Sequence, residues 1–208
     1  HAVCVVNATG VWVDALRRLA LPEGPNAQAL KTLVTPSQGV HVVVSRACLP
    51  IKEAVLIPKT SDGRVLFAVP RLGSTVIGTT DTPRSDAPID PLPMQEELDF
   101  LFCESEKSLG IKLKPSDVQS VWVGLRPLVG GNDSRATSQI SREHLIQREA
   151  RGLYTVTGGK WTTYRVMAEE VMQAIQKNAD LPQHQPAWPI PASTIWWAHL
   201  KATLPRKP

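Results

Sequence analysis

Hydrophobic positions recur at regular spacings that divide the chain into predicted strands and helices. Residues 2–6, AVCVV, form an apolar run typical of a buried strand. After NATG, residues 11–20 have the spacing of an amphipathic helix, and Gly10 at the junction permits close approach to the backbone. This strand–turn–helix unit is either an edge that binds an anion or a cofactor or an ordinary βα turn. Its predicted buried helical face consists of Trp12, Ala15, Leu16 and Leu19.

The pattern between residues 40 and 80 changes to four short β-rich runs, VHVVVS, AVLIP, RVLFAVP and TVIGTT. The turn-forming segments TSDG and RLGS separate them, which predicts a meandering antiparallel sheet. In the first run, alternation places Val40, Val42 and Val44 on one face and His41 with Val43 on the other. From this pattern alone, His41 is either a hydrogen-bonded structural residue or a catalytic one.

Residues 94–110 return to helical spacing and end at Gly110, which predicts an amphipathic connector helix whose acidic outer face is solvated. A strand follows over residues 117–131, in which Trp122, Gly124 and Arg126 share one side. We expect Arg126 to emerge at the end of this strand, before Pro127. There its planar guanidinium either binds a carboxylate or phosphate or forms a structural ion pair.

Residues 136–161 have the pattern of strand, turn and strand, with REARG as the reversal. The second strand leads to Gly158 and Gly159, then to Lys160 and a helix that ends near Asn178. Glycines, a mobile cation and a helix N-terminus together favour an anionic cofactor or substrate at this junction. Thr162 or Thr163 can cap the helix, and its predicted buried face consists of Val166, Met167, Val171 and Ile175.

The order of these units is βα, then an antiparallel sheet with a helix, then βα again. We therefore predict a mixed α/β fold in which a substrate-binding sheet interrupts a Rossmann-like cofactor domain. The predicted division is 1–32 for the first part of the cofactor domain and 33–151 for the substrate domain. Residues 152–180 form the return strand and helix, and 181–208 a tail rich in Pro and Trp.

Composition narrows the class of protein. The net charge is +4 and the pI near 9.1, but the basic residues are scattered among acidic ones without a long basic run, so we expect no nucleic-acid partner. The longest apolar runs are far shorter than the roughly 20 residues of a membrane-spanning helix, and no export signal is evident. Three cysteines without CxxC spacing indicate a reducing compartment, with neither a disulfide nor a metal site.

Six segments occur together in an order that resembles one family. They are VVNATGVWVD, TPSQGVHVVVSR, LIPKTSDGRVLFAVPRLGSTVIGTTDT, VWVGLRPLV, ISREH and TVTGGKWTTYRVMAEE. Their order and approximate spacing are similar to those of the FAD-dependent glycerol-3-phosphate dehydrogenases, over about residues 1–178. That resemblance implies a flavin-binding Rossmann-like domain with an antiparallel substrate sheet, as in the wider glycine and D-amino-acid oxidase group.

The resemblance also implies roles for individual residues. Arg126 matches an arginine that faces the substrate, and Arg142 a second one that engages the phosphate. Lys160 matches a lysine beside the flavin, where a cation stabilises negative charge on the reduced ring. His41 matches the position of a general base for the C2 hydroxyl, whereas Thr79, Thr80 and Asp81 order the sheet near the site. The implied cofactor-binding residues are Asn7, Ala8, Gly10, Gly158, Gly159, Lys160, Thr162 and Thr163.

The implied reaction is oxidation of sn-glycerol 3-phosphate to dihydroxyacetone phosphate by FAD, with electrons passed to a quinone. In the complete enzyme we expect a cytoplasmic location with peripheral attachment to the inner face of a membrane. Two alternatives stay open from the residues: a flavin oxidase of the same fold that acts on an amino acid, or a non-catalytic remnant that binds a phosphorylated ligand or a partner.

Three features depart from the family pattern. No GxGxxG fingerprint is present, so we do not expect tight FAD binding by this chain alone. Val11 stands where the family usually has proline. The segment after Asn178 does not resemble the family's helical C-terminal domain. It is a disordered or passively packed tail, a frameshifted end or an interfacial anchor. We further expect incompletely covered strand edges and helix-facing surfaces to promote self-association.

Overall fold

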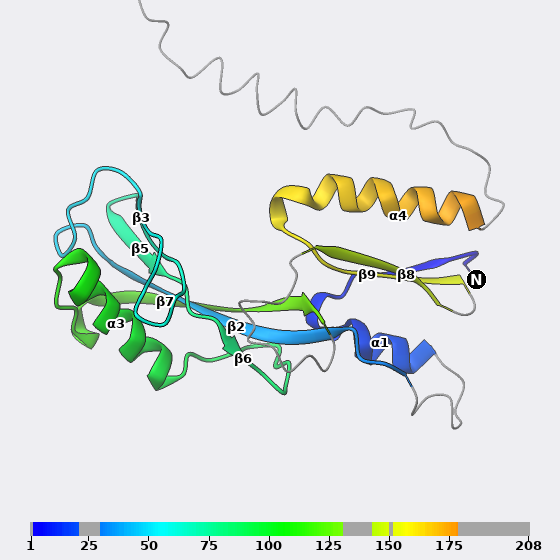
Figure 1. Cartoon of the computed structure of the whole chain (residues 1–208), viewed down its shortest axis with the longest axis horizontal. Helices are drawn as coiled ribbons and strands as arrows, with labels where there is room; N and C mark the ends of the chain where they lie inside the picture. The colour runs from blue at the N-terminus through cyan, green and yellow to red at the C-terminus, as the bar shows by residue number, and fades with distance from the viewer. Residues whose placement is uncertain (1, 21–29, 131–142, 150–151, 179–208) are drawn as a thin grey trace, which may run out of the picture.

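The structure is a computed structural model that describes residues 2–20, 30–130, 143–149 and 152–178 (Figure 1). The predicted tail at 181–208 lies outside these residues. The strands are β1 Val5–Asn7, β2 Val34–Ser45, β3 Val55–Ile57, β4 Leu66–Arg71, β5 Ser74–Gly78, β6 Thr82–Pro83, β7 Val118–Val129, β8 His144–Arg148 and β9 Leu153–Gly158. The helices are α1 Val13–Ala20, α3 Gln95–Leu109 and α4 Tyr164–Asn178, with 3₁₀ turns at η1 Gly10–Trp12, η2 Pro115–Asp117 and η5 Trp161–Thr163.

The smaller sheet joins the two ends of the described chain. Strand β1 pairs in parallel with β9, with Asn7 opposite Thr155, and β9 pairs antiparallel with β8. Helix α4 covers one face of this sheet and α1 the other (Figure 1). The chain thus leaves this layer after α1 and returns to it at β8, which confirms the predicted mixed α/β fold with an inserted antiparallel sheet.

The division at residue 151 assigned β8 to the substrate domain, whereas its hydrogen bonds place it in the smaller sheet. The reason is local, because β8 and β9 are consecutive strands of one hairpin. The remaining boundaries stay predictions.

The larger sheet is the predicted meander. Strands β3, β4, β5 and β2 are successive neighbours. Strands β5 and β6 both pair with one edge of β2, and β7 pairs with its opposite edge. Val40, Val42 and Val44 are fully buried and pack with Leu101 of α3, as their alternation predicts. The core of this half therefore lies between the sheet and α3.

Strand β7 lies within its predicted range of 117–131 but continues past Arg126. Arg126 does not end it, because pairing with β2 continues to Val129 opposite Val34. Pro127 is tolerated here since, in the described chain, β7 has β2 as its one ladder partner and therefore needs no second row of N–H donors. Arg126 thus projects from within the β2–β7 ladder of the larger sheet.

The end of α3 was predicted correctly, but the buried face of α1 was not. Helix α3 ends at Leu109, and Gly110 takes the left-handed conformation with φ 68°. The predicted face of α1 is wrong, because Val13, Asp14 and Arg17 are buried while Trp12 and Leu19 are exposed.

Helix α4 buries Val171 and Ile175 but exposes Val166, which the predicted face had included. In the described parts of the chain, no helix has the length and apolar content required to cross a membrane.

Candidate functional site

An open pocket lies on the face of the larger sheet that points away from α3. The paired strands β2 and β7 build it, because His41 lies opposite Trp122, and Gly39 opposite Gly124, in the ladder. These cross-strand neighbours project to the same side of the sheet. The lining is completed by Arg126 and the backbone between it and Trp122, so the pocket combines a histidine, an arginine and an indole.

The guanidinium of Arg126 is held in one orientation. Its Nη1 donates to the carbonyl oxygen of Thr80 at 3.1 Å, and its Nη2 donates to Oγ1 of Thr79 at 2.6 Å. The Asp81 carboxylate lies 4.0 Å away and is itself bonded by the Ser37 hydroxyl. Thr79, Thr80 and Asp81 thus order the site, as the resemblance implied, and Arg126 is both ion-paired and partly open to the pocket.

Gly39 makes this arrangement sterically possible. A Cβ atom at that position would lie 2.2 Å from Nη2 of Arg126. The guanidinium therefore lies directly against the backbone of β2.

His41 lies against the sheet in the same way. A Cβ atom on Gly78 would come within 2.3 Å of its ring, and Trp122 lies beside it with 6.5 Å between ring centroids. None of the residues that the structure describes forms a hydrogen bond with its imidazole. Burial, and then the nearby Arg126 cation, lower the pKa of His41 below its ordinary value of 6.5. The ring is therefore a neutral base at neutral pH.

The predicted cofactor segments meet at one edge of the smaller sheet. Because β1 and β9 are parallel, residues 7–10 and 158–163 both follow the carboxyl ends of their strands, where α/β folds bind nucleotides. The Thr157 hydroxyl contacts the carbonyl of Gly10 at 3.5 Å. Ala8, Lys160 and Thr162 are exposed there, which leaves this edge open to a ligand.

Other residues of these segments serve the protein itself. The Asn7 amide is fully buried and donates to the carbonyl of Val13 at 3.0 Å and to Thr155 at 3.3 Å. Thr163 bonds the backbone of Lys160 instead of capping α4.

Gly158 and Gly159 both have φ 75°, and a Cβ on either would collide with Glu143 or Met167. Their glycine character is therefore explained by internal packing. The site keeps an exposed cation, Lys160, and open backbone at Gly10, which fit an anionic cofactor.

Strand β7 links the pocket to this edge, because it packs against β9 and η1. A Cβ on Gly158 would lie 2.5 Å from Val129, which is three residues beyond Arg126 on β7. Arg142 lies outside the described residues. The convergence of Arg126, Arg142 and Lys160 on one substrate stays a prediction.

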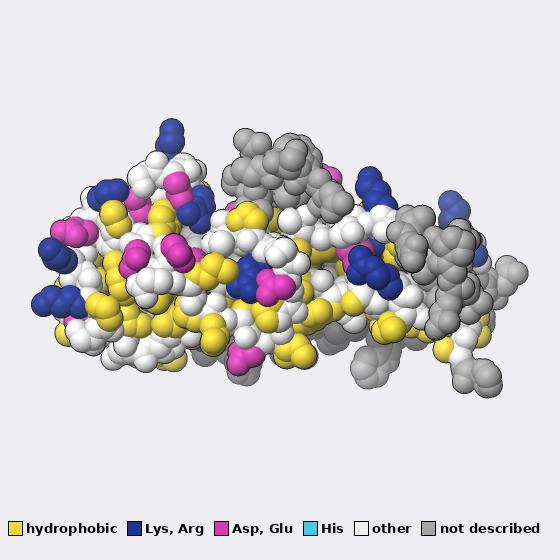
Figure 2. Space-filling view, turned by 90° about the horizontal axis from the view of Figure 1, so that it is seen from below, with side chains coloured by type: hydrophobic (Ala, Val, Ile, Leu, Met, Phe, Trp, Pro, Cys, Tyr) yellow, Lys and Arg dark blue, Asp and Glu magenta, His cyan; other side chains and the backbone are white. Residues whose placement is uncertain are grey.

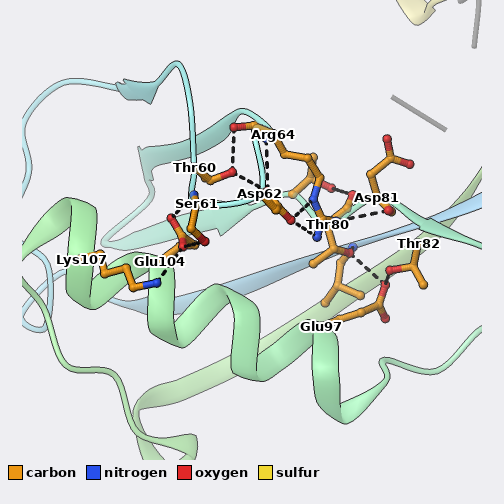
Figure 3. A network of polar contacts seen from close by, with 12 residues as sticks. Thr60, Ser61, Asp62, Arg64, Thr80, Asp81, Thr82, Glu97, Glu104 and Lys107 are labelled. Atoms are coloured by element: carbon orange, nitrogen blue, oxygen red, sulfur yellow. Dashed lines mark hydrogen bonds and ion pairs between the residues drawn. The ribbon is translucent and has the colours of Figure 1, made fainter. Parts of the chain in front are cut away.

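Sequence reasoning missed the buried acids of α3. Glu97 and Glu104 are almost fully buried, so the expectation of a wholly solvated acidic face is wrong. The signal was available, because Glu97, Leu101 and Glu104 are spaced four and three residues apart and share the apolar side of the helix. The polar contacts that explain their burial are formed with strands distant in sequence (Figure 3).

Comparison with known proteins agrees with this geometry. The sequence model of the FAD-dependent oxidoreductase (DAO) family matches residues 1–174. The chain belongs to this family. Similarity to the glycerol-3-phosphate dehydrogenases confirms the predicted resemblance, and the family itself is FAD-dependent.

Curated relatives carry that activity in their names. The chain is 40% identical to the mitochondrial glycerol-3-phosphate dehydrogenase SDP6 of Arabidopsis thaliana over 181 residues, which is 87% of this chain and 28% of that protein. It is also 40% identical to the mitochondrial glycerol-3-phosphate dehydrogenase of Homo sapiens over 183 residues, covering 87% and 24%. The chain therefore spans about a quarter of the length of these relatives.

Solved structures agree on the fold. The glycerol-3-phosphate dehydrogenase of Bacillus halodurans, solved with FAD, matches with a TM-score of 0.68 and 34% identity over 86% of this chain and 33% of that chain. A glycine oxidase from Geobacillus kaustophilus matches with a TM-score of 0.54 at 19% identity, covering 88% and 44%, which concerns the fold alone.

Proposed function

We propose that this chain carries the substrate-facing part of an enzyme that oxidises sn-glycerol 3-phosphate to dihydroxyacetone phosphate. One observation supports this proposal most directly. A neutral, partly buried histidine, His41, and an arginine held in one orientation, Arg126, line the same pocket. An anionic polyol needs both: a base for its hydroxyl proton and a cation for its charge. The names of the similar proteins support glycerol 3-phosphate as this substrate.

The proposed chemistry divides between His41 and Arg126. A ring nitrogen of His41 accepts the proton of the C2 hydroxyl, and the lowered pKa of His41 keeps that nitrogen available at neutral pH. Arg126 orients the substrate through its planar guanidinium. Trp122 borders His41 and limits water access on one side. Arg142 is proposed as the second phosphate ligand, since two guanidinium groups match a dianion.

The two-electron oxidant for C2 of the substrate would be supplied by FAD when it is bound. Residues 7–10 and 158–163 are proposed to hold it at the edge where β1 and β9 end. Lys160 would place a positive charge beside the ring, where reduction creates negative charge. Asn7 acts indirectly, because its buried amide ties the turn after β1 to β9.

We extend the proposal to the rest of the enzyme. The electrons pass to a quinone, and the full-length protein attaches peripherally to a membrane surface. The predicted cytoplasmic location of its catalytic face is part of the same proposal; the names of the curated relatives place those proteins in mitochondria.

Steady-state kinetics of the full-length enzyme test the role of Arg126. Arg126→Ala should raise the Michaelis constant for glycerol 3-phosphate by about 100-fold, because a charge-assisted contact of roughly 3 kcal/mol is lost. The absorbance of bound flavin should change little. Gly39→Ala should act in the same direction, since the new methyl group displaces the guanidinium without removing it. Unchanged kinetics in both variants would remove Arg126 from the site.

Substrate identity has a separate test. Glycerol 3-phosphate added anaerobically should bleach the flavin of the full-length enzyme, whereas D-alanine should not. Bleaching by the amino acid alone would replace the proposed reaction by that of an amino-acid oxidase.

A further inference from the structure

The strongest unassigned feature is a buried carboxylate behind the pocket. Glu97 of α3 is only 3% exposed and lies on the core side of the larger sheet, opposite the face that carries His41. One oxygen accepts from Thr80 Oγ1 at 2.9 Å and Thr82 Oγ1 at 2.7 Å. The other accepts from the Gln38 amide at 2.6 Å and the Met94 backbone at 3.0 Å. Figure 3 shows the two threonines reaching this carboxylate from the strand side.

The four hydrogen bonds fix both the charge and the position of Glu97. Burial raises the pKa of its carboxyl, but the bonds from Met94, Thr82, Gln38 and Thr80 outweigh burial and hold that pKa below its ordinary value. Glu97 is therefore an anion with every lone-pair direction in use. A buried carboxylate with four hydrogen bonds holds the segments that donate to it in fixed positions.

One of the segments that Glu97 binds also holds Arg126. Thr80 gives its hydroxyl to Glu97, accepts the Val40 amide at 2.9 Å, and offers its carbonyl oxygen to Nη1 of Arg126. Glu97 is thus two contacts away from the guanidinium, through one intervening residue. The far side of the same segment is fastened by Arg64, whose Nη1 donates to the Asp81 carbonyl at 3.2 Å.

From these contacts we infer that Glu97 is a positioning residue for Arg126, acting from the opposite side of the sheet through Thr80. The inference rests on the proposed function for its kinetic test. It predicts that loss of Glu97 impairs the alignment of the guanidinium while leaving His41 and the cofactor edge intact.

The matched control is Glu104, on the same helix. It is 2% exposed and accepts from both the hydroxyl and the backbone amide of Ser61, with Lys107 beside it (Figure 3). None of these partners contacts Arg126. Glu104→Gln therefore removes a second buried carboxylate of α3 that has no direct contact with Thr80 or Arg126.

The kinetic experiment compares Glu97→Gln, Glu97→Ala and Glu104→Gln in the full-length enzyme. Glutamine has one acceptor oxygen where Glu97 uses two, so Glu97→Gln should raise the Michaelis constant for glycerol 3-phosphate about tenfold, and Glu97→Ala further. Turnover at saturation should fall less, and Glu104→Gln should leave the Michaelis constant unchanged. In an Arg126→Ala background, Glu97→Gln should add no further change. A full additional increase in that background would show that Glu97 does not act through Arg126.

A second readout does not depend on the substrate. An arginine-specific dicarbonyl reagent followed by peptide mass spectrometry reports the reactivity of Arg126 directly. Its modification should be faster in Glu97→Ala than in the wild type, and unchanged in Glu104→Gln. Equal rates in all three proteins would overturn the inference even if glycerol 3-phosphate is the substrate, whereas a faster rate would support it even if the substrate differs.

Discussion

At the scale of single residues, the pocket depends on side chains that lie flat against glycine. The Arg126 guanidinium lies over Gly39, and the His41 imidazole lies over Gly78. Each occupies space that a Cβ atom would fill if the glycine were replaced by another residue. Close contact with the backbone limits their rotamers and brings the imidazole near the guanidinium. This proximity contributes to the lowered pKa of His41, because each positive charge disfavours the other.

The pH dependence of the full-length enzyme should report that proximity. The acid limb of kcat/KM is expected to have an apparent pKa below 6.5, since burial and Arg126 both favour neutral His41. Arg126→Gln should move this limb upward by removing the cation, and His41→Asn should abolish it. A wild-type acid limb above 6.5 would contradict the assignment of His41 as the base.

The lowered pKa of His41 also makes the free energy of unfolding depend on pH. The unfolded chain binds a proton at His41 more readily than the folded chain does, so this contribution to the free energy of unfolding is complete above pH 6.5. It is lost as the pH falls through the folded pKa.

At the scale of elements, buried charge sets the contact between α1, β2 and β8. The Asp14 carboxylate accepts the backbone amides of Leu33 and Val34 at 3.0–3.1 Å. Arg17 lies 2.6 Å from both Asp14 and Glu149, and its side chain is 2% exposed. One guanidinium therefore ties a helix to the start of β2 and the end of β8. This is why α1 turns its charged side inward, against its apolar periodicity.

Removal of that guanidinium should be costly. Arg17→Ala leaves two nearly buried carboxylates without a cation, and the free energy of unfolding should fall by about 3–5 kcal/mol. Arg165→Ala is the matched control, because the Arg165–Glu169 pair is about half exposed and should contribute about 0.3–0.5 kcal/mol. Urea unfolding of the full-length variants would measure both. Similar losses would show that the Arg17 cluster is no more important than a surface pair.

At the scale of the whole molecule, much apolar surface faces outward. Figure 2 shows hydrophobic side chains distributed along the length of one face. Ile89 and Leu92 are 89% and 72% exposed, and Trp161 beside Lys160 is 91% exposed. Soluble monomers rarely expose large contiguous apolar patches. These residues are therefore expected to contact further protein, in the longer enzyme or between copies.

The isolated 208-residue chain should self-associate. Sedimentation velocity at micromolar concentration should show species larger than the 22.7 kDa chain, and their fraction should rise with protein concentration. Trp161→Ser should reduce association without lowering the unfolding temperature, because this side chain is exposed. A single monomeric species across the concentration range would refute the prediction.

The sequence by itself determined most of the elements, their order and the buried side of β2, although β6 was not predicted. Alternation of two residues separated Val40 and Val42 from His41, and the left-handed conformation available to Gly110 marked the end of α3, because both effects act within one or two turns of chain. The resemblance carried by the motifs added the family and its cofactor class. Strand alternation and the end of α3 depend on neighbouring residues, and the family can be read from the sequence motifs.

The tertiary structure alone decided which partners the buried polar groups bind. Glu97 lies beneath Thr80, and Arg17 reaches Glu149 across 132 positions of sequence. No periodicity encodes such contacts, because the energy of a buried charge depends on partners that only folding brings within hydrogen-bond distance. The orientation of Arg126, and with it the proposed substrate pocket, is a property of the assembled sheet.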